Sequence, residues 1–188
     1  KKILSENEIG KILKIESSFG FKARVKPSSR LFSKELGGGA VLDVGCYPIS
    51  FLMLFDDSKN GIKFLNKEIS LSSTNVDDFA EANLKTSNDI SANIKVSLKE
   101  NFVNNCIIKG VNGEIVVPNP WIPGKKTFLE IKKNKKYYKK FIDSEKSIYA
   151  HQIEKVSKIF KDSSSNNEKL FDINKSLICS ILLEEWIA

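Results

Sequence analysis

The sequence predicts an α+β fold in which helices pack on one face of an open, mainly antiparallel β-sheet. Three observations lead to this prediction. Several consecutive segments alternate apolar and polar residues, which is the pattern of strands that bury one face. Short links join most of these segments, so successive strands are expected to run in opposite directions. Segments with helical patterns lie before, within and after the strands, as in folds whose helices cover one sheet face.

The chain has the size and composition of one globular domain spanning residues 1–188. Of its 188 residues, 41% are hydrophobic and 28% are charged, which is enough to build a buried core. No apolar stretch approaches the roughly 18 residues that a membrane span needs, and the N-terminus lacks the pattern of a signal peptide. Cys46, Cys106 and Cys179 lie far apart, without the spacing of metal ligands. We therefore expect reduced thiols, a cytoplasmic location, no bound metal and no membrane contact.

The first third of the chain predicts the end of a helix, a strand, a loop and a second helix. Residues 1–9 have the pattern of a helix end that Gly10 stops. Residues 13–21 alternate between an apolar and a polar face, which predicts a long strand. Residues 23–36 form a polar connection and are expected to be a loop. The glycines that follow lead into a helix expected over roughly residues 39–55.

The remaining elements follow from the same kinds of pattern. Every second residue from Ile90 to Leu98 is apolar, which is the cleanest strand alternation in the chain. Asn112-Gly113 is a strong signal for a hairpin turn, and Asp172 suits the N-cap of a last helix. The expected elements are strands over residues 62–72, 76–86, 90–98, 101–110 and 114–117, two short strands within 127–141, helices over 148–160 and 172–187, and a loop over 162–167.

The net charge of +7 raises the alternative of a basic module that binds nucleic acid or another polyanion. The densest basic cluster is the run KKNKKYYKK over residues 132–140, where lysines flank two tyrosines of the kind that stack with bases. Only two of the 30 basic residues are arginines, the residue better suited to bidentate phosphate recognition. We favour a solvated hairpin whose edge lysines discourage strand pairing, and we expect no nucleic-acid partner.

Asp43 and Tyr47 are the residues whose pairing has the clearest chemical meaning. They lie four residues apart, so on a helix both side chains share one face. Asp43 lies near the start of the expected helix, where the dipole favours a negative charge. The Tyr47 phenol exchanges protons, but with an ordinary pKa of about 10 it needs a cation to work near neutral pH. Pro48 is expected to interrupt the helix beside it. The same spacing also fits a structural pair, with Asp43 at a helix start and Tyr47 at the core rim.

Residues 37–48, GGGAVLDVGCYP, are similar to a glycine-rich segment of the Gfo/Idh/MocA oxidoreductases, closest to the dimeric dihydrodiol dehydrogenase and D-xylose dehydrogenase group of that family. Shorter similarities accompany it in order along nearly the whole chain. They are EIGKI at residues 8–12, SFG at 18–20, Arg30, VDD at 76–78, NPWIP at 119–123 and YAHQIE at 149–154.

The resemblance implies a two-domain oxidoreductase in which this chain supplies the C-terminal domain. In that family an N-terminal Rossmann domain binds NAD or NADP and carries a catalytic lysine in a Glu-Lys-Pro motif. The C-terminal domain is an open sheet that closes the substrate site and commonly forms the dimer. The resemblance places Tyr47 at the acid/base position and Asp43 where it orients the substrate hydroxyl and the tyrosine. It makes Phe19, Arg30 and Trp121 weaker candidates for lining the substrate pocket.

The chain departs from the family pattern in one respect. Residues 1–188 contain neither a Glu-Lys-Pro motif nor a dinucleotide fingerprint. We therefore expect that the N-terminal dinucleotide-binding domain is missing from this chain, that the cofactor is bound mainly there, and that the chain alone is inactive. The resemblance implies a sugar, polyol or cyclic diol as substrate and a homodimer or higher homo-oligomer formed through the sheet face. A non-catalytic basic binding module and a structural dimerisation domain are the alternatives.

Overall fold

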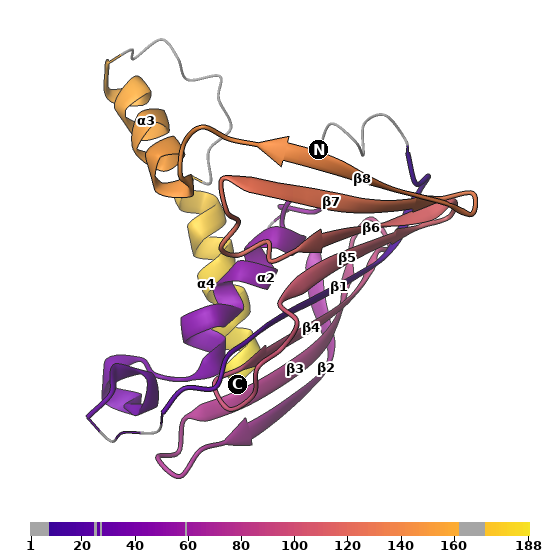
Figure 1. The fold of residues 1–188 in the computed structure, drawn as a ribbon. Coiled ribbons are helices and arrows are strands. Elements are labelled where there is room, and N and C mark those ends of the chain that lie inside the picture. Colours follow the sequence, from indigo (N-terminus) through magenta and orange to yellow (C-terminus); the bar gives the residue numbers. More distant parts are fainter. Residues whose placement is uncertain (1–7, 25, 27, 59, 162–171) are drawn as a thin grey trace.

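The computed structural model describes residues 8–24, 26, 28–58, 60–161 and 172–188, which form one eight-stranded sheet with helices on one side (Figure 1). The strands lie in the order β2-β3-β4-β1-β5-β6-β7-β8. Their bounds are Ile12–Gly20 (β1), Ile62–Leu71 (β2), Asp77–Thr86 (β3), Ser91–Ser97 (β4), Asn105–Gly110 (β5), Gly113–Pro118 (β6), Lys126–Lys133 (β7) and Lys136–Asp143 (β8). The predicted α+β class and its open sheet are confirmed.

β1 lies near the centre of the sheet and gives it its one parallel pair. It pairs with β4 in parallel and with β5 antiparallel, while the other neighbouring strands pair antiparallel. A parallel pair needs a crossover connection. Here the chain leaves β1, crosses one face through a helix, and returns as the consecutive strands β2, β3 and β4. The predicted mainly antiparallel sheet is confirmed, with this parallel contact added.

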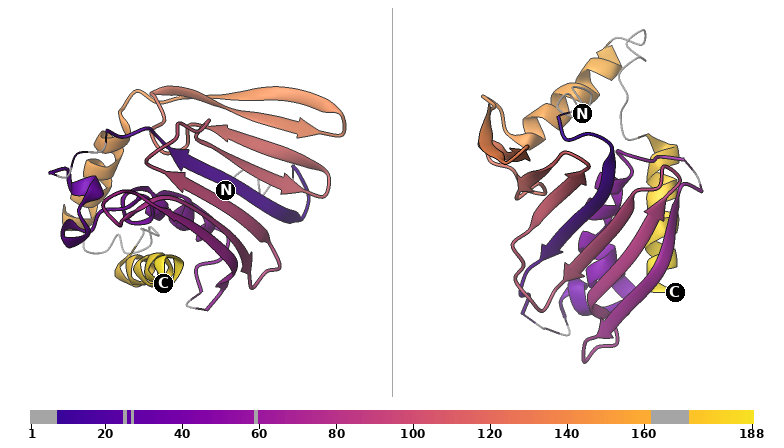
Figure 2. Two further views of the ribbon diagram at one scale, coloured as in Figure 1. Left: turned by 90° about the horizontal axis from the view of Figure 1, so that it is seen from below. Right: turned by 90° about the vertical axis from the view of Figure 1, so that its right-hand side faces the viewer.

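Two helices cover one face of the sheet. A π-helical turn at Val41–Gly45 runs into α2 (Cys46–Leu52), and together they form what we call the site helix, residues 41–52. The site helix packs between the sheet and α4 (Ile173–Ile187) (Figure 2). The helix expected over residues 39–55 is thus confirmed, with a widened first turn. These helices and the sheet enclose the core.

The third helix stands apart from this layer. α3 (Ile148–Lys161) follows β8 and contains no buried residue (Figure 1). At the start of α4, Asp172 accepts a hydrogen bond from the Lys175 backbone N–H at 3.0 Å, which confirms its predicted N-cap role. None of the helices in the described ranges is long and apolar enough to cross a membrane.

Strand alternation places the core where the sequence predicts it. Ile90 and Leu98 are buried, as are Ala92, Ile94 and Val96 between them. The expected helix end over residues 1–9 falls mostly on residues 1–7, which lie outside the described residues, as does the expected loop over 162–167. The expected loop over 23–36 contains two short 3-10 turns, Arg30–Phe32 and Lys34–Leu36.

The sheet face opposite the helices carries ion pairs. The Glu16 carboxylate pairs with the Lys109 ammonium at 2.5 Å and with Lys14 at 2.7 Å, and Glu81 pairs with Lys95 at 3.0 Å. Because Ile15 is buried on the helix side, Glu16 next to it in β1 points to the opposite face. We call this surface the free face of the sheet. It is polar along its central strands.

Candidate functional site

The site helix begins in a tight turn held by a buried carboxylate. Gly39 has φ +118, a conformation that favours glycine. The Asp77 side chain at the start of β3 accepts a hydrogen bond from the Val41 backbone N–H at 2.7 Å. Asp43 donates its own backbone N–H to the Gly39 carbonyl at 3.0 Å. The glycine turn therefore brings the chain against Asp77.

A π-helical turn carries Asp43, and Tyr47 follows in the first turn of α2. Pro48 has no N–H to donate, and its ring would collide with the carbonyl four residues earlier in a regular α-helix. The π-helical turn over Val41–Gly45 ends three residues before Pro48 and includes Val44, whose carbonyl is the one that the ring would meet. The interruption that Pro48 predicts is therefore present as a widened turn.

Gly45 lets α4 lie close behind the site helix. A Cβ atom added at Gly45 would lie 3.2 Å from Leu183 Cδ2 and 3.4 Å from the Trp186 ring. Leu183 and Trp186 are both buried. α4 thus packs closely against the segment that carries Asp43 and Tyr47.

The Tyr47 ring contacts two aromatic rings from distant parts of the chain. The Tyr47 ring stands edge-on to Phe19, with centroids 5.1 Å apart, and to Trp121, with centroids 6.1 Å apart. Phe19 and Trp121 are nearly parallel at 5.9 Å. The Trp121 indole N–H donates to the Ser18 carbonyl at 2.8 Å, so this polar group is already satisfied by the backbone. Tyr47 remains 42% exposed, while Phe19 and Trp121 are buried.

Asp43 and Arg30 form an ion pair beside this aromatic cluster. The Arg30 guanidinium donates to the Asp43 carboxylate, and the Arg30 side chain is 57% exposed against 18% for Asp43. The five residues selected from the sequence thus gather in two adjoining groups, namely the ring cluster of Phe19, Tyr47 and Trp121 and the ion pair of Arg30 with Asp43.

The surroundings of Tyr47 favour its neutral form. Burial raises the pKa of the Tyr47 phenol above its usual value, and the electrostatic effect of the neighbouring Cys46 and Asp43 side chains raises it further. Burial likewise raises the pKa of the neighbouring Cys46 thiol. In this setting the Tyr47 phenol is protonated at neutral pH and able to donate its proton.

Two residues of this region were missed in the sequence. Phe51 meets the Trp121 ring edge-on at 6.1 Å, and its position four residues after Tyr47 on one helix face was a usable signal. Asp77 is separated by 36 residues from Val41, whose N–H it accepts, and no local pattern links the two.

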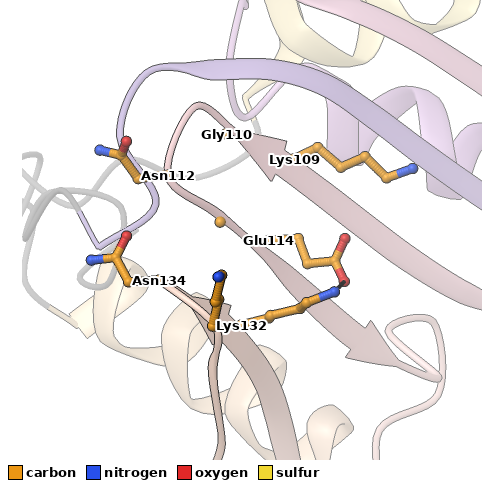
Figure 3. Close-up of a pocket in the computed structure, with 8 residues that line it drawn as sticks. Lys109, Gly110, Asn112, Glu114, Lys132 and Asn134 are labelled. Atoms are coloured by element: carbon orange, nitrogen blue, oxygen red, sulfur yellow. Dashed lines mark ion pairs between the residues drawn. The ribbon is translucent and has the colours of Figure 1, made fainter.

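A hollow lies away from this cluster, at the lysine-rich turns of the sheet (Figure 3). It measures about 310 Å³ and is lined by the turns of the β5–β6 and β7–β8 hairpins. Lys132 pairs with Glu114 at 3.9 Å and Lys109 with Glu16 at 2.5 Å, so glutamates offset part of the positive charge. This arrangement does not favour a polyanion site. Within the described ranges no group of three His, Cys, Asp or Glu side chains is placed to hold a metal ion.

Comparison with known sequences identifies relatives of the chain. The GFO/IDH/MocA C-terminal domain family profile matches residues 1–116. A trans-1,2-dihydrobenzene-1,2-diol dehydrogenase from Danio rerio is 30% identical over 123 residues, covering 65% of this chain and 36% of that protein. The Xenopus laevis enzyme of the same name is 31% identical over 137 residues, covering 69% of this chain and 40% of that protein. The chain therefore spans well under half the length of these relatives.

Solved structures share the fold at lower sequence identity. KijD10, a 3-ketoreductase from Actinomadura kijaniata solved with NADP and TDP-benzene, superposes with a TM-score of 0.85 at 20% identity, covering 97% of this chain and 55% of that one. An aldose-aldose oxidoreductase from Caulobacter crescentus, complexed with glycerol, gives a TM-score of 0.83 at 16% identity, covering 98% of this chain and 55% of that one. At these identities the likeness concerns the fold.

Proposed function

This chain belongs to the GFO/IDH/MocA C-terminal domain family, and we propose that it is the substrate-side domain of an NAD(P)-dependent oxidoreductase acting on a CH–OH group. The observation that carries the proposal is the position of the Tyr47 phenol, half exposed at the mouth of the ring cluster and beside the Asp43 carboxylate. A proton donor and an acceptor next to apolar rings suit a substrate with vicinal hydroxyls on a carbon skeleton. We therefore infer a sugar, polyol or cyclic diol as substrate.

Each residue has a distinct part in this proposal. Tyr47 exchanges a proton with the substrate oxygen, and Asp43 accepts a hydrogen bond from a substrate hydroxyl. Arg30 donates to the Asp43 carboxylate and fixes its orientation through their ion pair. Phe19 and Trp121, each 8% exposed, form the apolar layer behind Tyr47, and the Trp121 N–H is occupied by the Ser18 carbonyl.

The glycine turn does not fit a dinucleotide. A Cβ at Gly38 would lie 2.7 Å from the carbonyl oxygens of Arg30 and Leu31, and Gly39 faces the Asp77 carboxylate. Carbonyl oxygens and a carboxylate repel a pyrophosphate, which needs N–H donors. We infer that NAD or NADP is bound mainly by a separate dinucleotide-binding domain, as the family resemblance implies.

The raised pKa of Tyr47 has a consequence for the chain alone. Arg30 is paired with Asp43, so a further cation is needed to bring the phenol pKa toward neutral pH. We propose that this cation comes from the cofactor-binding domain. The chain alone is then expected to bind substrate weakly and to show no nicotinamide-dependent turnover.

A binding experiment tests the proposal on the chain itself. The chain is labelled with 5-fluorotryptophan, and the Trp121 signal is assigned with Trp186→Phe and followed by fluorine NMR during titration with a trans-cyclic diol, an aldose and a linear polyol. One of them is expected to shift the Trp121 signal in a saturable way. Asp43→Asn should weaken binding, whereas Lys140→Gln, on the exposed strand β8, is the matched surface control.

Two outcomes would count against the proposal. If the ligands shift neither tryptophan signal at millimolar concentration, the cluster is not a substrate surface. If the chain alone reduces NAD or NADP with any of these alcohols, the inferred division between two domains is wrong.

We also propose that two copies associate through the free face of the sheet. The helices lie against the other face or beyond β8, so the described residues leave this broad surface uncovered (Figures 1 and 2). Its ion pairs, such as Glu16 with Lys109, give any interface there a polar character.

A further inference from the structure

Asp77 is a buried carboxylate held against the start of the site helix. It is the first residue of β3, and only 5% of its surface is exposed. Its Oδ2 accepts the Val41 backbone N–H at 2.7 Å. The first N–H groups of a helix have no partner within the helix, so this carboxylate satisfies one of them from the sheet. The contact therefore joins the sheet to the segment that carries the candidate site.

The fit between Asp77 and Gly39 leaves no room for a side chain on the glycine. A Cβ atom at Gly39 would lie 2.0 Å from Asp77 Oδ1. Gly39 also has φ +118, which other residues rarely adopt. The third glycine of the GGG run is thus explained by the approach of Asp77 and needs no ligand to account for it.

We propose that Asp77 is a positioning residue for the candidate site: by holding the Val41 N–H, its carboxylate fixes where Tyr47 lies against Phe19 and Trp121 and where Asp43 meets Arg30. The proposal rests on the proposed function only for the roles of Asp43 and Tyr47. The contact itself acts through the backbone. Asp43 follows Val41 by two residues, and Tyr47 follows by six. A shift at Val41 is therefore passed to both side chains along one short helix.

The charged side chains near Asp77 on β3 and on the site helix are paired with other residues. Asp78, next along β3, points to the other face of the sheet and pairs with Lys99 at 3.3 Å. On the site helix Asp43 is paired with Arg30. Burial raises the pKa of the Asp77 carboxyl, and the Val41 N–H acts in the opposite direction. Proton uptake by Asp77 weakens the hydrogen bond to Val41, because a neutral carboxyl is a poorer acceptor than a carboxylate.

The test follows the position of the Trp121 ring, which touches Tyr47, without requiring turnover. The full chain is labelled with 5-fluorotryptophan, and fluorine NMR spectra are recorded from about pH 4, close to the ordinary aspartate pKa of about 3.9, up to about pH 8. Trp186→Phe assigns the Trp121 signal. The titration is run on the wild-type chain, on Asp77→Asn and on Asp56→Asn. Asp56 is the matched control, since it is also buried and accepts the Ser87 backbone N–H at 2.8 Å, but it lies after the site helix.

The wild-type Trp121 signal is expected to move through an inflection that disappears in Asp77→Asn and persists in Asp56→Asn. An inflection that persists in Asp77→Asn, or a wild-type signal that stays constant over this range, overturns the proposal. The wild-type titration needs no variant, so the proposal stays testable if Asp77→Asn folds poorly. A negative result here leaves the proposed function standing, because substrate binding is read separately in the ligand titration.

Discussion

The Arg30 guanidinium lies against the Asp43 carboxylate, and this pair governs what each residue offers a substrate. Arg30 is more than half exposed, so the pair contributes little to stability, typically about 0–1 kcal/mol. Its value lies in fixing the orientation of the Asp43 carboxylate beside Tyr47. A substrate hydroxyl can therefore bond to Asp43 at small cost to the fold. We therefore expect Arg30 to act on the substrate mainly through Asp43, and less through the direct contact that the family resemblance implies.

The glycine turn makes a prediction about stability at residue level. Gly39→Ala is expected to destabilise the chain by about 2 kcal/mol or more, because alanine is strained at φ +118 and its Cβ would meet Asp77 Oδ1. Gly124→Ala is the control, since a Cβ there meets only the Lys126 carbonyl at 3.5 Å, and it should change stability by less than about 0.5 kcal/mol. Urea unfolding measures both. Adding Asp77→Ser should recover part of the loss, and equal stability of the two alanine variants would contradict the close fit.

The two buried aspartates predict opposite dependences of stability on pH. Burial raises the folded-state pKa of Asp77, so its contribution is most favourable at low pH and is lost as pH rises through that pKa. Burial also acts to raise the pKa of Asp56, but hydrogen bonds from Ser87 and Ser58 outweigh it and lower the pKa. The Asp56 contribution is therefore present above the unfolded value of about 3.9 and is lost as pH falls through the folded value.

Urea unfolding at several pH values from about pH 3 to about pH 7 measures this difference. The stability of wild type minus that of Asp77→Asn should fall as pH rises. The stability of wild type minus that of Asp56→Asn should rise. If both stability differences change in the same direction with pH, the pKa values of Asp77 and Asp56 are not shifted in opposite directions.

At the level of elements, local patterns predict strands and helices better than they predict partners. The alternation from Ile90 to Leu98 marks β4 because each residue's side of the sheet is a local property. The parallel pairing of β1 with β4 leaves no such mark, since it depends on the crossover between them. The contact of Asp77 with Val41 also joins residues far apart in the sequence, and no local pattern marks it. No local pattern marks Trp121 either, which is a candidate only through the family resemblance. Most contacts that build the site are long-range, so the sequence pointed to five of its residues and missed Asp77 and Phe51, and of the pairings it predicted only the local one between Asp43 and Tyr47.

α4 packs against the core, whereas α3 contains no buried residue. Shortening an apolar side chain is therefore expected to destabilise the chain more in α4 than in α3. Leu182 in α4 is 5% exposed and Ile153 in α3 is 67% exposed. Leu182→Ala should therefore cost about 3 kcal/mol through lost burial and a cavity, and Ile153→Ala less than about 0.5 kcal/mol. Thermal and urea unfolding measure both. A large loss from Ile153→Ala would mean that another surface covers α3 in solution.

At the level of the whole molecule, the sheet separates two surfaces of different character. The helix side carries the ring cluster and the core, and the free face carries ion pairs. At the lysine-rich end, every residue of β8 is exposed, so this edge strand is a competing surface for association. The proposed dimer through the free face and a dimer through β8 involve different residues, so mutation distinguishes them.

Sedimentation equilibrium at micromolar concentration is expected to show a dimer that weakens in Glu16→Lys. This substitution removes the partner of Lys14 and Lys109 and places three like charges together on the free face. The matched variant Phe141→Lys, on β8, should leave a free-face dimer intact because Phe141 is 77% exposed at the edge of the sheet. Dissociation by Phe141→Lys alone would move the interface to β8. A monomer in the wild-type chain would contradict association through either surface, and the free face would then be a solvated one.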